Sequence, residues 1–219
     1  MNRTAGKKKW VPFKNFIYDF VMLTGALPGF IWFRPKYVFE SEKAKERIKG
    51  GALLVSNHLS IFDPIYLMFA VWYRRQHFVC AKELCRNKFI SWFFKNGGCI
   101  PIDRENPDFD SMREIIASLK NDEIVSIFPE GHINEEESTL DSFKSGPVLM
   151  SVTGGKPIVP LYIKRRPGFC GRLIVIKGEA IDFMEIYGKR PNGAQLAEIA
   201  EKLREKEQKL MRIYEEKYK

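Results

Sequence analysis

The chain has 219 residues and a net charge of +9, and 45% of its residues are hydrophobic and 13% aromatic. These values exclude a disordered chain and are sufficient for one domain with a sizeable core. Most of the charge lies in residues 1–50, which hold eleven Lys and Arg against four Asp and Glu, or +7.

The N-terminal segment joins a basic stretch to a long apolar one. The lysines of GKKKW, residues 6–10, precede FIYDFVMLTGALPGFIWF, residues 16–33. Basic residues beside an apolar stretch rich in Trp and Phe are typical of a membrane-surface anchor. The apolar run is about long enough to cross a bilayer, but it contains Asp19, Pro28 and two glycines. We therefore expect an interfacial or re-entrant helical pair, with a single span as the second interpretation and a buried core helix as the third.

The composition shift near residue 35 predicts two parts, a membrane-associating helical segment over residues 1–35 and an α/β domain over residues 36–219. The four cysteines, Cys80, Cys85, Cys99 and Cys170, have no C-x-x-C spacing. Reduced thiols in a cytosol-facing protein fit this pattern, and no pair of ligands has the spacing of a structural zinc site. We expect a protein on the cytoplasmic face of a membrane, monotopic or with one N-terminal span, and without a bound metal.

Short β-rich runs alternate with helix-forming segments in the predicted α/β domain. The expected strands are residues 52–56, 78–81, 99–102, 123–128, 157–163 and 172–178, and the expected helices are about 64–73, 87–95, 109–120 and 143–152. The strands are apolar throughout, as expected when helices cover both faces of a sheet. This alternation predicts an α/β fold with a mostly parallel sheet flanked by helices.

The chain ends in a charged segment, residues 193–218, with the periodicity of a helix. Five apolar residues share one stripe of it: Leu196, Ile199, Leu203, Leu210 and Tyr214. We expect this helix to pack on the domain, since the repeat is short for a coiled coil.

The stretch SNHLSIFDPI, residues 56–65, follows the first buried strand and places His58 five positions before Asp63. Open α/β folds bind their ligands beyond the carboxyl ends of the strands, which favours a functional histidine here. A carboxylate on one ring nitrogen would fix the tautomer, so that the other nitrogen could act as a base. The alternative is structural, because Asp63 before Pro64 also fits a helix N-cap followed by a first-turn proline.

Three further clusters follow at strand ends. They are GCIPIDR, residues 98–104, then FPEGH, residues 128–132, and GGKPIVPLYI, residues 154–163. The first ends in an arginine, whose planar fork suits phosphate. Taken one at a time, these clusters also fit surface ion pairs and turns.

Their order is more informative. NHLSIFD, GCIPIDR, FPEG and PIVPLYI, within about 105 residues, closely resemble the four signature blocks of the glycerolipid acyltransferases, the lysophosphatidate acyltransferase family. The resemblance covers most of the α/β domain and implies the fold of that family. It also implies a membrane lipid acceptor, with acyl-CoA or acyl-carrier protein as donor substrate and no cofactor.

The resemblance also implies roles for single residues. His58 would be the general base and Asp63 its partner, and no acyl-enzyme would form. Oxyanion donors are expected among backbone N–H groups near this pair. Arg104, Glu130 and Gly131 would hold the glycerol phosphate of the acceptor, and Lys144, in SFKSG, could add to that site or be solvated. The implied product is phosphatidate, made from 1-acylglycerol 3-phosphate at an anionic membrane surface.

The third block departs from the family pattern. Family members commonly continue it with Thr-Arg, whereas this chain has His132 and Ile133. The missing cation at Ile133 leaves open another lysolipid or an amine or hydroxyl acceptor. A non-catalytic lipid-binding protein is a further alternative. Nucleic acid is not an expected partner, because the basic residues lie in an aromatic tail and not on the folded domain.

Overall fold

The computed structural model describes residues 16–103, 109–134, 136, 139–168, 171–187 and 191–218. Its strands are β1 (Lys36–Phe39), β2 (Ala52–Ser56), β3 (Gln76–Ala81), β4 (Ile100–Ile102), β5 (Ile124–Ile127), β6 (Ile158–Arg165) and β7 (Leu173–Lys177). Its α-helices are α1 (Phe16–Phe33), α2 (Asp63–Ala70), α3 (Lys88–Asn96), α4 (Phe109–Lys120), α5 (Gly146–Gly154), α6 (Phe183–Tyr187) and α7 (Gly193–Tyr218). Two short 3-10 helices are η1 (Lys43–Lys45) and η2 (Lys82–Cys85).

The strands form one seven-stranded sheet in the order β1-β7-β6-β2-β5-β3-β4. Every neighbouring pair is parallel except β6 and β7. This confirms the mostly parallel α/β sheet and all six strands expected from the sequence. The seventh strand, β1, was not expected, because its four residues form a short edge strand with little apolar signal. We call the edge of the sheet at the carboxyl ends of β2, β5 and β6 the carboxyl edge.

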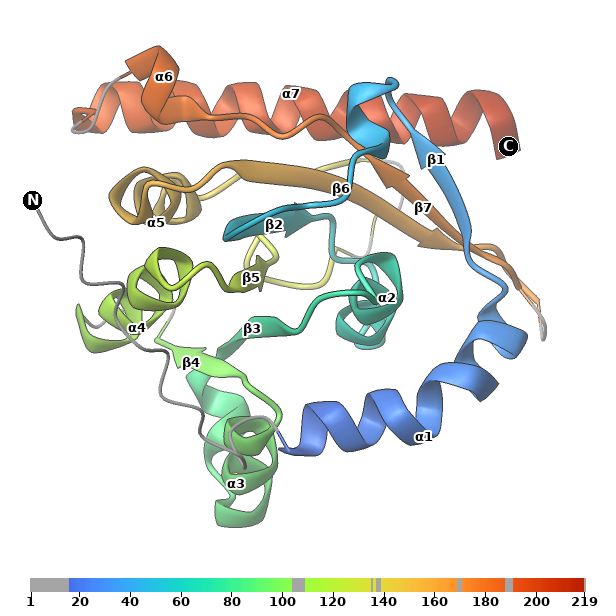
Figure 1. Ribbon diagram of the computed structural model, residues 1–219. Helices are drawn as coiled ribbons and strands as arrows, with labels where there is room; N and C mark the ends of the chain where they lie inside the picture. The colour runs from blue at the N-terminus through green and yellow to red at the C-terminus, as the bar shows by residue number, and fades with distance from the viewer. Residues whose placement is uncertain are drawn as a thin grey trace, which may run out of the picture.

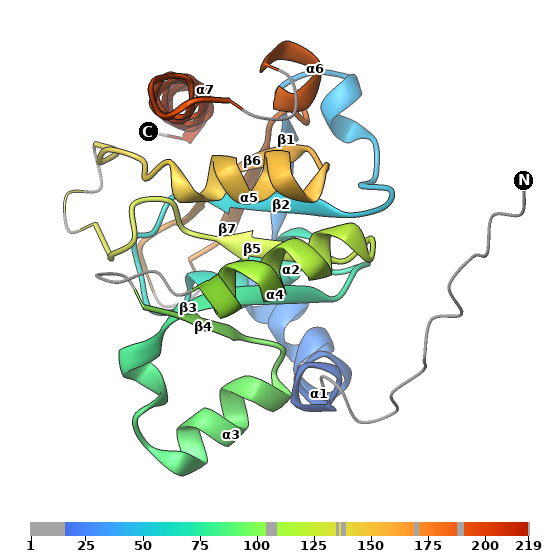
Figure 2. The same ribbon diagram turned by 90° about the vertical axis from the view of Figure 1, so that its left-hand side faces the viewer.

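Helices cover both faces of the sheet, which explains why its strands are apolar throughout. On one face, α1 and α2 pack against β2, β6 and β7. On the other face, α4 and α5 lie side by side, with α7 along the end of the molecule nearest β1 (Figures 1 and 2). The predicted stripe of α7 faces the sheet, with Ile199, Leu203, Leu210 and Tyr214 buried. The described cysteines, Cys80, Cys85 and Cys99, form no disulfide, and Cys170 lies outside the described residues.

Helix α1 is a single continuous helix over the apolar run, so the expected helical pair is wrong for residues 16–33. It is the one described helix that is long and apolar enough to cross a membrane, and only 17% of it is buried. Proline inside a helix removes a hydrogen bond and bends it, and α1, which contains Pro28, curves toward β1 in Figure 1. The predicted division at residues 35 and 36 stays a prediction.

The packing of α1 on the domain is aromatic at its C-terminal end and ionic near its N-terminal end. The ring of Phe30 lies 5.1 Å from that of Phe69, and the ring of Phe33 lies 5.3 Å from that of Tyr66. Asp19 accepts two hydrogen bonds, of 2.6 and 2.7 Å, from the guanidinium of Arg75. The opposite side of α1 remains exposed.

Candidate active site

The loop that carries His58 starts from a fixed position at the carboxyl edge. Asn57, directly after β2, is buried, and its side-chain amide makes two hydrogen bonds to the backbone of Ile163 in β6. The amide nitrogen donates to the Ile163 carbonyl over 2.9 Å, and the Ile163 N–H donates to the amide oxygen over 2.8 Å. Asn57 therefore extends the β2–β6 pairing by one residue and positions the residue that follows it.

His58 and Asp63 are in direct contact, as the predicted pairing requires. Nδ1 of His58 lies 2.9 Å from Oδ2 of Asp63, and their side chains are 13% and 4% exposed. A carboxylate can only accept, so Nδ1 carries the proton and Nε2 is the basic nitrogen. Among the described residues, no group hydrogen-bonds Nε2.

The carboxylate of Asp63 does not cap α2, so the N-cap interpretation is wrong. The helix starts at Asp63 itself, and the residue before it, Phe62, makes no side-chain cap. Oδ2 of Asp63 instead accepts hydrogen bonds from the backbone N–H groups of Leu59, at 2.6 Å, and Ser60, at 2.8 Å. The loop therefore folds back around the carboxylate, and these donors hold it against the His58 ring.

The ring of His58 rests on Phe128, which directly follows β5. The two rings stack with their centroids 4.1 Å apart and an angle of 14° between their planes. The stack and the Asp63 hydrogen bond together restrict both rotation and displacement of the imidazole. Sequence reasoning singled out the third block for its Glu130 and Gly131, and it missed the contact made by Phe128.

Glu130 lies behind His58 and is 2% exposed. Its Oε1 accepts from the backbone N–H of His58 at 3.2 Å. Its Oε2 accepts from the Asn134 side chain, at 3.0 Å, and from the Asp141 backbone, at 3.1 Å. All of these partners belong to the protein, so the acceptor-binding role expected for Glu130 stays a prediction.

Asn134, which sequence reasoning missed, completes this support. Its backbone N–H donates to the carbonyl oxygen of His58 over 2.7 Å, while its side chain donates to Glu130 and to the carbonyl of Thr139. Both backbone polar groups of His58 are thus bound by residues 130–134. The expected oxyanion donors are not the N–H groups of His58, Leu59 or Ser60, because those already donate to Glu130 and Asp63.

Gly131 and Lys144 lie next to each other, and the binding role expected for them stays a prediction. Gly131 has a φ of +80°, and a Cβ at this position would lie 3.2 Å from both Cε and Nζ of Lys144. The backbone N–H of Lys144 donates to the carbonyl of Pro129 over 3.1 Å. The lysine side chain is exposed, so its ammonium group lies beside the glycine and open to a ligand.

His132 is held away from such a ligand. Its Nε2 lies 2.8 Å from Oδ2 of Asp141, and its Nδ1 lies 3.1 Å from the carbonyl oxygen of Glu130. Both ring nitrogens therefore face acceptors within the protein. Ile133 is 42% exposed beside it. Arg104 lies outside the described residues, so its predicted role and the prediction that no metal takes part both stay predictions.

Behind Glu130 lies a second buried carboxyl group, that of Glu207 in α7. Glu207 is 0% exposed, and neither of its carboxyl oxygens has a hydrogen-bond partner among the described residues. Burial, with a further contribution from the charge of Glu130, raises the pKa of Glu207 well above its usual value of 4.5.

Helix α3 carries an apolar surface that sequence reasoning did not single out. Phe89, Ile90, Trp92 and Phe93 are all more than 40% exposed. This helix lies next to α1 at one end of the molecule (Figures 1 and 2). The available signal was the run KFISWFFK, residues 88–95, whose aromatic residues lie between lysines as those near the N-terminus do.

The chain is similar to several known proteins. Residues 36–164 match the family model described as Acyltransferase. A 1-acyl-sn-glycerol-3-phosphate acyltransferase of Bacillus subtilis is 31% identical over 169 residues, which cover 74% of this chain and 83% of that protein. A protein of the same name from Streptococcus pneumoniae is 31% identical over 110 residues, or 50% of this chain and 40% of that one.

The fold also has a counterpart among solved structures. The crystal structure of a 1-acyl-sn-glycerophosphate (LPA) acyltransferase from Thermotoga maritima matches with a TM-score of 0.62. The match covers 91% of this chain and 80% of that chain, at 19% sequence identity. At that identity the likeness concerns the fold, which the two chains share.

Proposed function

This chain belongs to the glycerolipid acyltransferase family and is an acyltransferase, and we propose that it acylates 1-acylglycerol 3-phosphate to give phosphatidate. The donor in this proposal is a fatty acyl thioester, either acyl-CoA or acyl-carrier protein. The names of the relatives from Bacillus subtilis and Streptococcus pneumoniae support the choice of acceptor.

The observation that carries the proposal is the 2.9 Å contact between His58 and Asp63. With the proton of the pair on Nδ1, the lone pair on Nε2 can take a proton from a hydroxyl group. The charge on Asp63 stabilises the imidazolium ion that results. The stack on Phe128 keeps the ring in place during the transfer.

The reaction then proceeds without an acyl-enzyme. As Nε2 of His58 takes the hydroxyl proton, the acceptor oxygen attacks the thioester carbonyl carbon and forms the new C–O bond. The tetrahedral intermediate collapses with cleavage of the C–S bond. The departing thiolate takes the proton from the imidazolium of His58, so the free thiol leaves and the base returns to its starting form.

Two cationic groups would bind the acceptor phosphate. One is Lys144, whose ammonium group lies beside Gly131, and the other is Arg104 of the second sequence block. His132 is not part of this proposal, because Asp141 and the Glu130 carbonyl already take both of its ring nitrogens. Lys144 would therefore supply the charge that Ile133 lacks.

The substrate is a membrane lipid, and we propose that α1 and α3 hold the protein at an anionic membrane surface on the cytoplasmic side. The exposed apolar residues of α1 include Leu23, at 84%, and Leu27, at 71%. Those of α3 continue the surface, and Lys88 and Lys95 lie at its two ends. Such a basic aromatic surface favours the interface of an anionic bilayer.

The test is the identity of the product formed by purified protein in detergent or vesicles. Lysophosphatidate and a labelled acyl thioester are supplied together with a lysolipid that lacks the phosphate monoester and with an amine-bearing acceptor, and the products are identified by mass spectrometry. We expect labelled phosphatidate from the wild type and at least a 10²-fold lower rate from His58→Ala. Equal rates would refute the role of His58, and a preference for the phosphate-free acceptor would refute the choice of substrate.

A further inference from the structure

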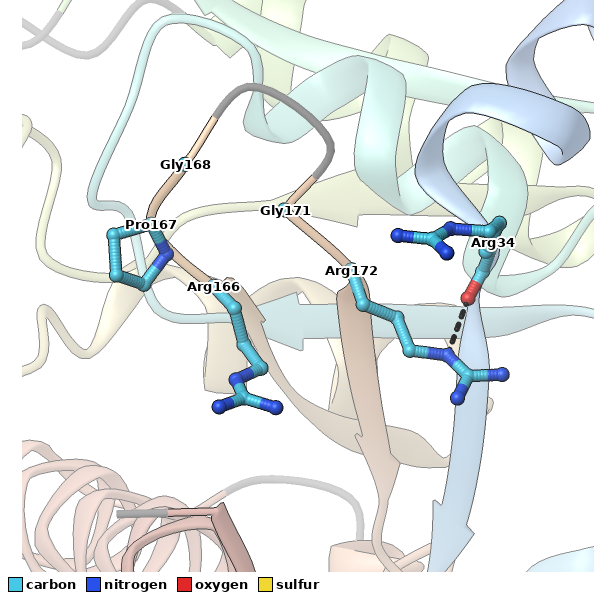
Figure 3. A pocket seen from close by; sticks show the side chains of 6 residues that line it. All are labelled: Arg34, Arg166, Pro167, Gly168, Gly171 and Arg172. Atoms are coloured by element: carbon cyan, nitrogen blue, oxygen red, sulfur yellow. Dashed lines mark hydrogen bonds between the residues drawn. The ribbon is translucent and has the colours of Figure 1, made fainter.

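A second charged site lies at the carboxyl edge, on the side of β6 away from β5. It is an open pocket of about 390 Å³, lined by Arg34, Arg166, Pro167, Gly168, Gly171 and Arg172. We call it the arginine pocket (Figure 3). Three of its six lining residues are arginines and none is acidic. Arg34 is more than 130 positions from the other five in the sequence.

The hairpin between β6 and β7 holds two of these arginines opposite each other. The backbone N–H of Arg166 donates to the carbonyl of Arg172 over 2.9 Å, and both side chains extend to the same side of the hairpin (Figure 3). Gly171 allows this close pairing, because a Cβ there would lie 1.8 Å from the carbonyl oxygen of Arg166. The pocket thus depends on a glycine at this position.

The third arginine comes from the end of α1. Nε of Arg172 donates to the carbonyl oxygen of Arg34 over 2.9 Å, which ties the hairpin to the residue directly after the helix (Figure 3). Among the described residues, neither Arg166 nor the terminal nitrogens of Arg172 have a hydrogen-bond or ion-pair partner. Guanidinium groups that line one open pocket give it a positive charge, which favours the binding of an anion.

The arginine pocket and the His58–Asp63 pair share one edge of the sheet. Strand β6 is parallel to β2, with Leu161 opposite Ser56, so both strands run toward this edge. Tyr66, one helical turn after Asp63 in α2, is near Arg165, the last residue of β6: burial raises the pKa of Tyr66, and the charge of Arg165 opposes this rise. Arg165 also donates to the carbonyl oxygens of Gly168 and Gly171, at 3.3 and 3.1 Å. One residue therefore links the turn of the pocket to the helix of the catalytic pair.

We propose that the arginine pocket binds a phosphate ester group, as a site separate from the one expected at Arg104 and Lys144. The planar fork of a guanidinium pairs with two phosphate oxygens at once, and several arginines together can neutralise a doubly charged group. The choice of ligand class rests on the proposed function, which brings two phosphate esters to this edge: the lipid head group and the soluble donor. The location of Arg34 at the end of the membrane helix α1 is compatible with either source.

Direct binding separates the two sources and requires no turnover. Arg166→Gln is compared with Arg113→Gln, which removes another exposed arginine, from α4. The probes are coenzyme A in solution and phosphatidylcholine vesicles with and without phosphatidate, measured with the full-length protein. We expect Arg166→Gln to weaken binding of one probe by on the order of tenfold, while Arg113→Gln binds like the wild type.

Weaker binding of coenzyme A would identify the donor as the source of the phosphate, and weaker binding of phosphatidate vesicles would identify the lipid. If Arg166→Gln and Arg113→Gln bind every probe equally, the proposal is wrong. A kinetic measurement provides a second criterion, since the KM of the identified substrate should rise by the same factor while kcat is retained. A protein that turns over no lysophosphatidate but shows the binding difference would refute the proposed function and leave the pocket assignment standing.

Discussion

The carboxylate of Glu130 lies 3.2 Å from the backbone nitrogen of His58 and accepts its hydrogen bond, although the two residues are 72 positions apart in sequence. Together with the bond from Asn134 to the His58 carbonyl, this contact joins the third sequence block to the first. Glu130 can therefore affect the proposed reaction by holding the backbone of His58, without contact to a substrate.

Glu130→Gln tests this positioning role. An ionised Glu130 accepts with both oxygens, whereas a glutamine must turn its amide N–H2 either toward the His58 N–H or toward the donors on Asn134 and Asp141. Two donors then face each other in a buried place, which costs about 1–3 kcal/mol of unfolding free energy. We expect a lower Tm and a lower kcat. A matched control is Glu136→Gln, an exposed acid of the same loop; a rise in KM with unchanged Tm would instead indicate a substrate contact.

Asp63 places a negative charge beside His58 and accepts hydrogen bonds from the loop, and two substitutions test these contributions separately. Asp63→Asn keeps an oxygen for the ring Nδ1–H of His58 and for the backbone N–H groups of Leu59 and Ser60, but it loses the negative charge beside the imidazolium. The imidazolium ion formed during proton transfer then has no opposite charge beside it, so we expect kcat to fall about 10- to 1000-fold with little change in Tm. Asp63→Ala also leaves the loop N–H groups without their acceptor.

For Asp63→Ala we expect the same loss of charge together with about 1–3 kcal/mol of lost stability. The measurements are kcat and the urea dependence of unfolding for both variants. Equal stability of the two variants would show that the loop hydrogen bonds at 2.6 and 2.8 Å contribute nothing to the fold.

Much of the fold was predictable, because it depends on local patterns. The six apolar runs identified their strands, and the stripe Ile199, Leu203, Leu210 and Tyr214 identified the buried side of α7. The contact between His58 and Asp63 was predictable as well, since five positions of chain separate them. The helix-cap interpretation failed because the direction of the Asp63 carboxylate depends on how the loop folds back, which spacing does not determine.

Other parts of the site depend on long-range pairing. Phe128 and Asn134 reach His58 only because β5 is the neighbour of β2, and strand order cannot be read from apolar runs. The arginine pocket likewise joins Arg34 to Arg172 through the pairing of β1 with β7. The position of β1 was itself missed, so no local feature of the sequence could have brought these residues together.

Glu207 provides a test based on pH. Because burial raises its pKa well above 4.5, the unfolded chain loses this proton at a lower pH than the folded protein does. The free energy of unfolding therefore falls as pH rises above about 4.5, by at most about 1.4 kcal/mol per pH unit, until the folded group ionises. Glu207→Gln cannot ionise, so this fall should disappear.

We expect the Tm of Glu207→Gln relative to that of the wild type to increase as the pH rises above about 5. Glu205→Gln, at an exposed position of the same helix, is the control and should show a difference that does not change with pH. A constant offset for Glu207→Gln would mean that the buried carboxyl group does not titrate in this range.

The apolar surface of α3 can be tested by its affinity for vesicles. Phe89 is 70% exposed on α3, and Phe109 is 78% exposed on α4, so Phe89→Gln and Phe109→Gln remove similar exposed areas from different parts of the molecule. Transfer of a phenylalanine side chain out of water is worth about 1.5–3 kcal/mol. If α3 enters the bilayer interface beside α1, Phe89→Gln should lower vesicle partitioning by on the order of tenfold or more and Phe109→Gln should not.

Since neither side chain is buried, both proteins should keep the Tm of the wild type. Equal partitioning of the two variants would restrict the membrane contact to α1 and the segment before it.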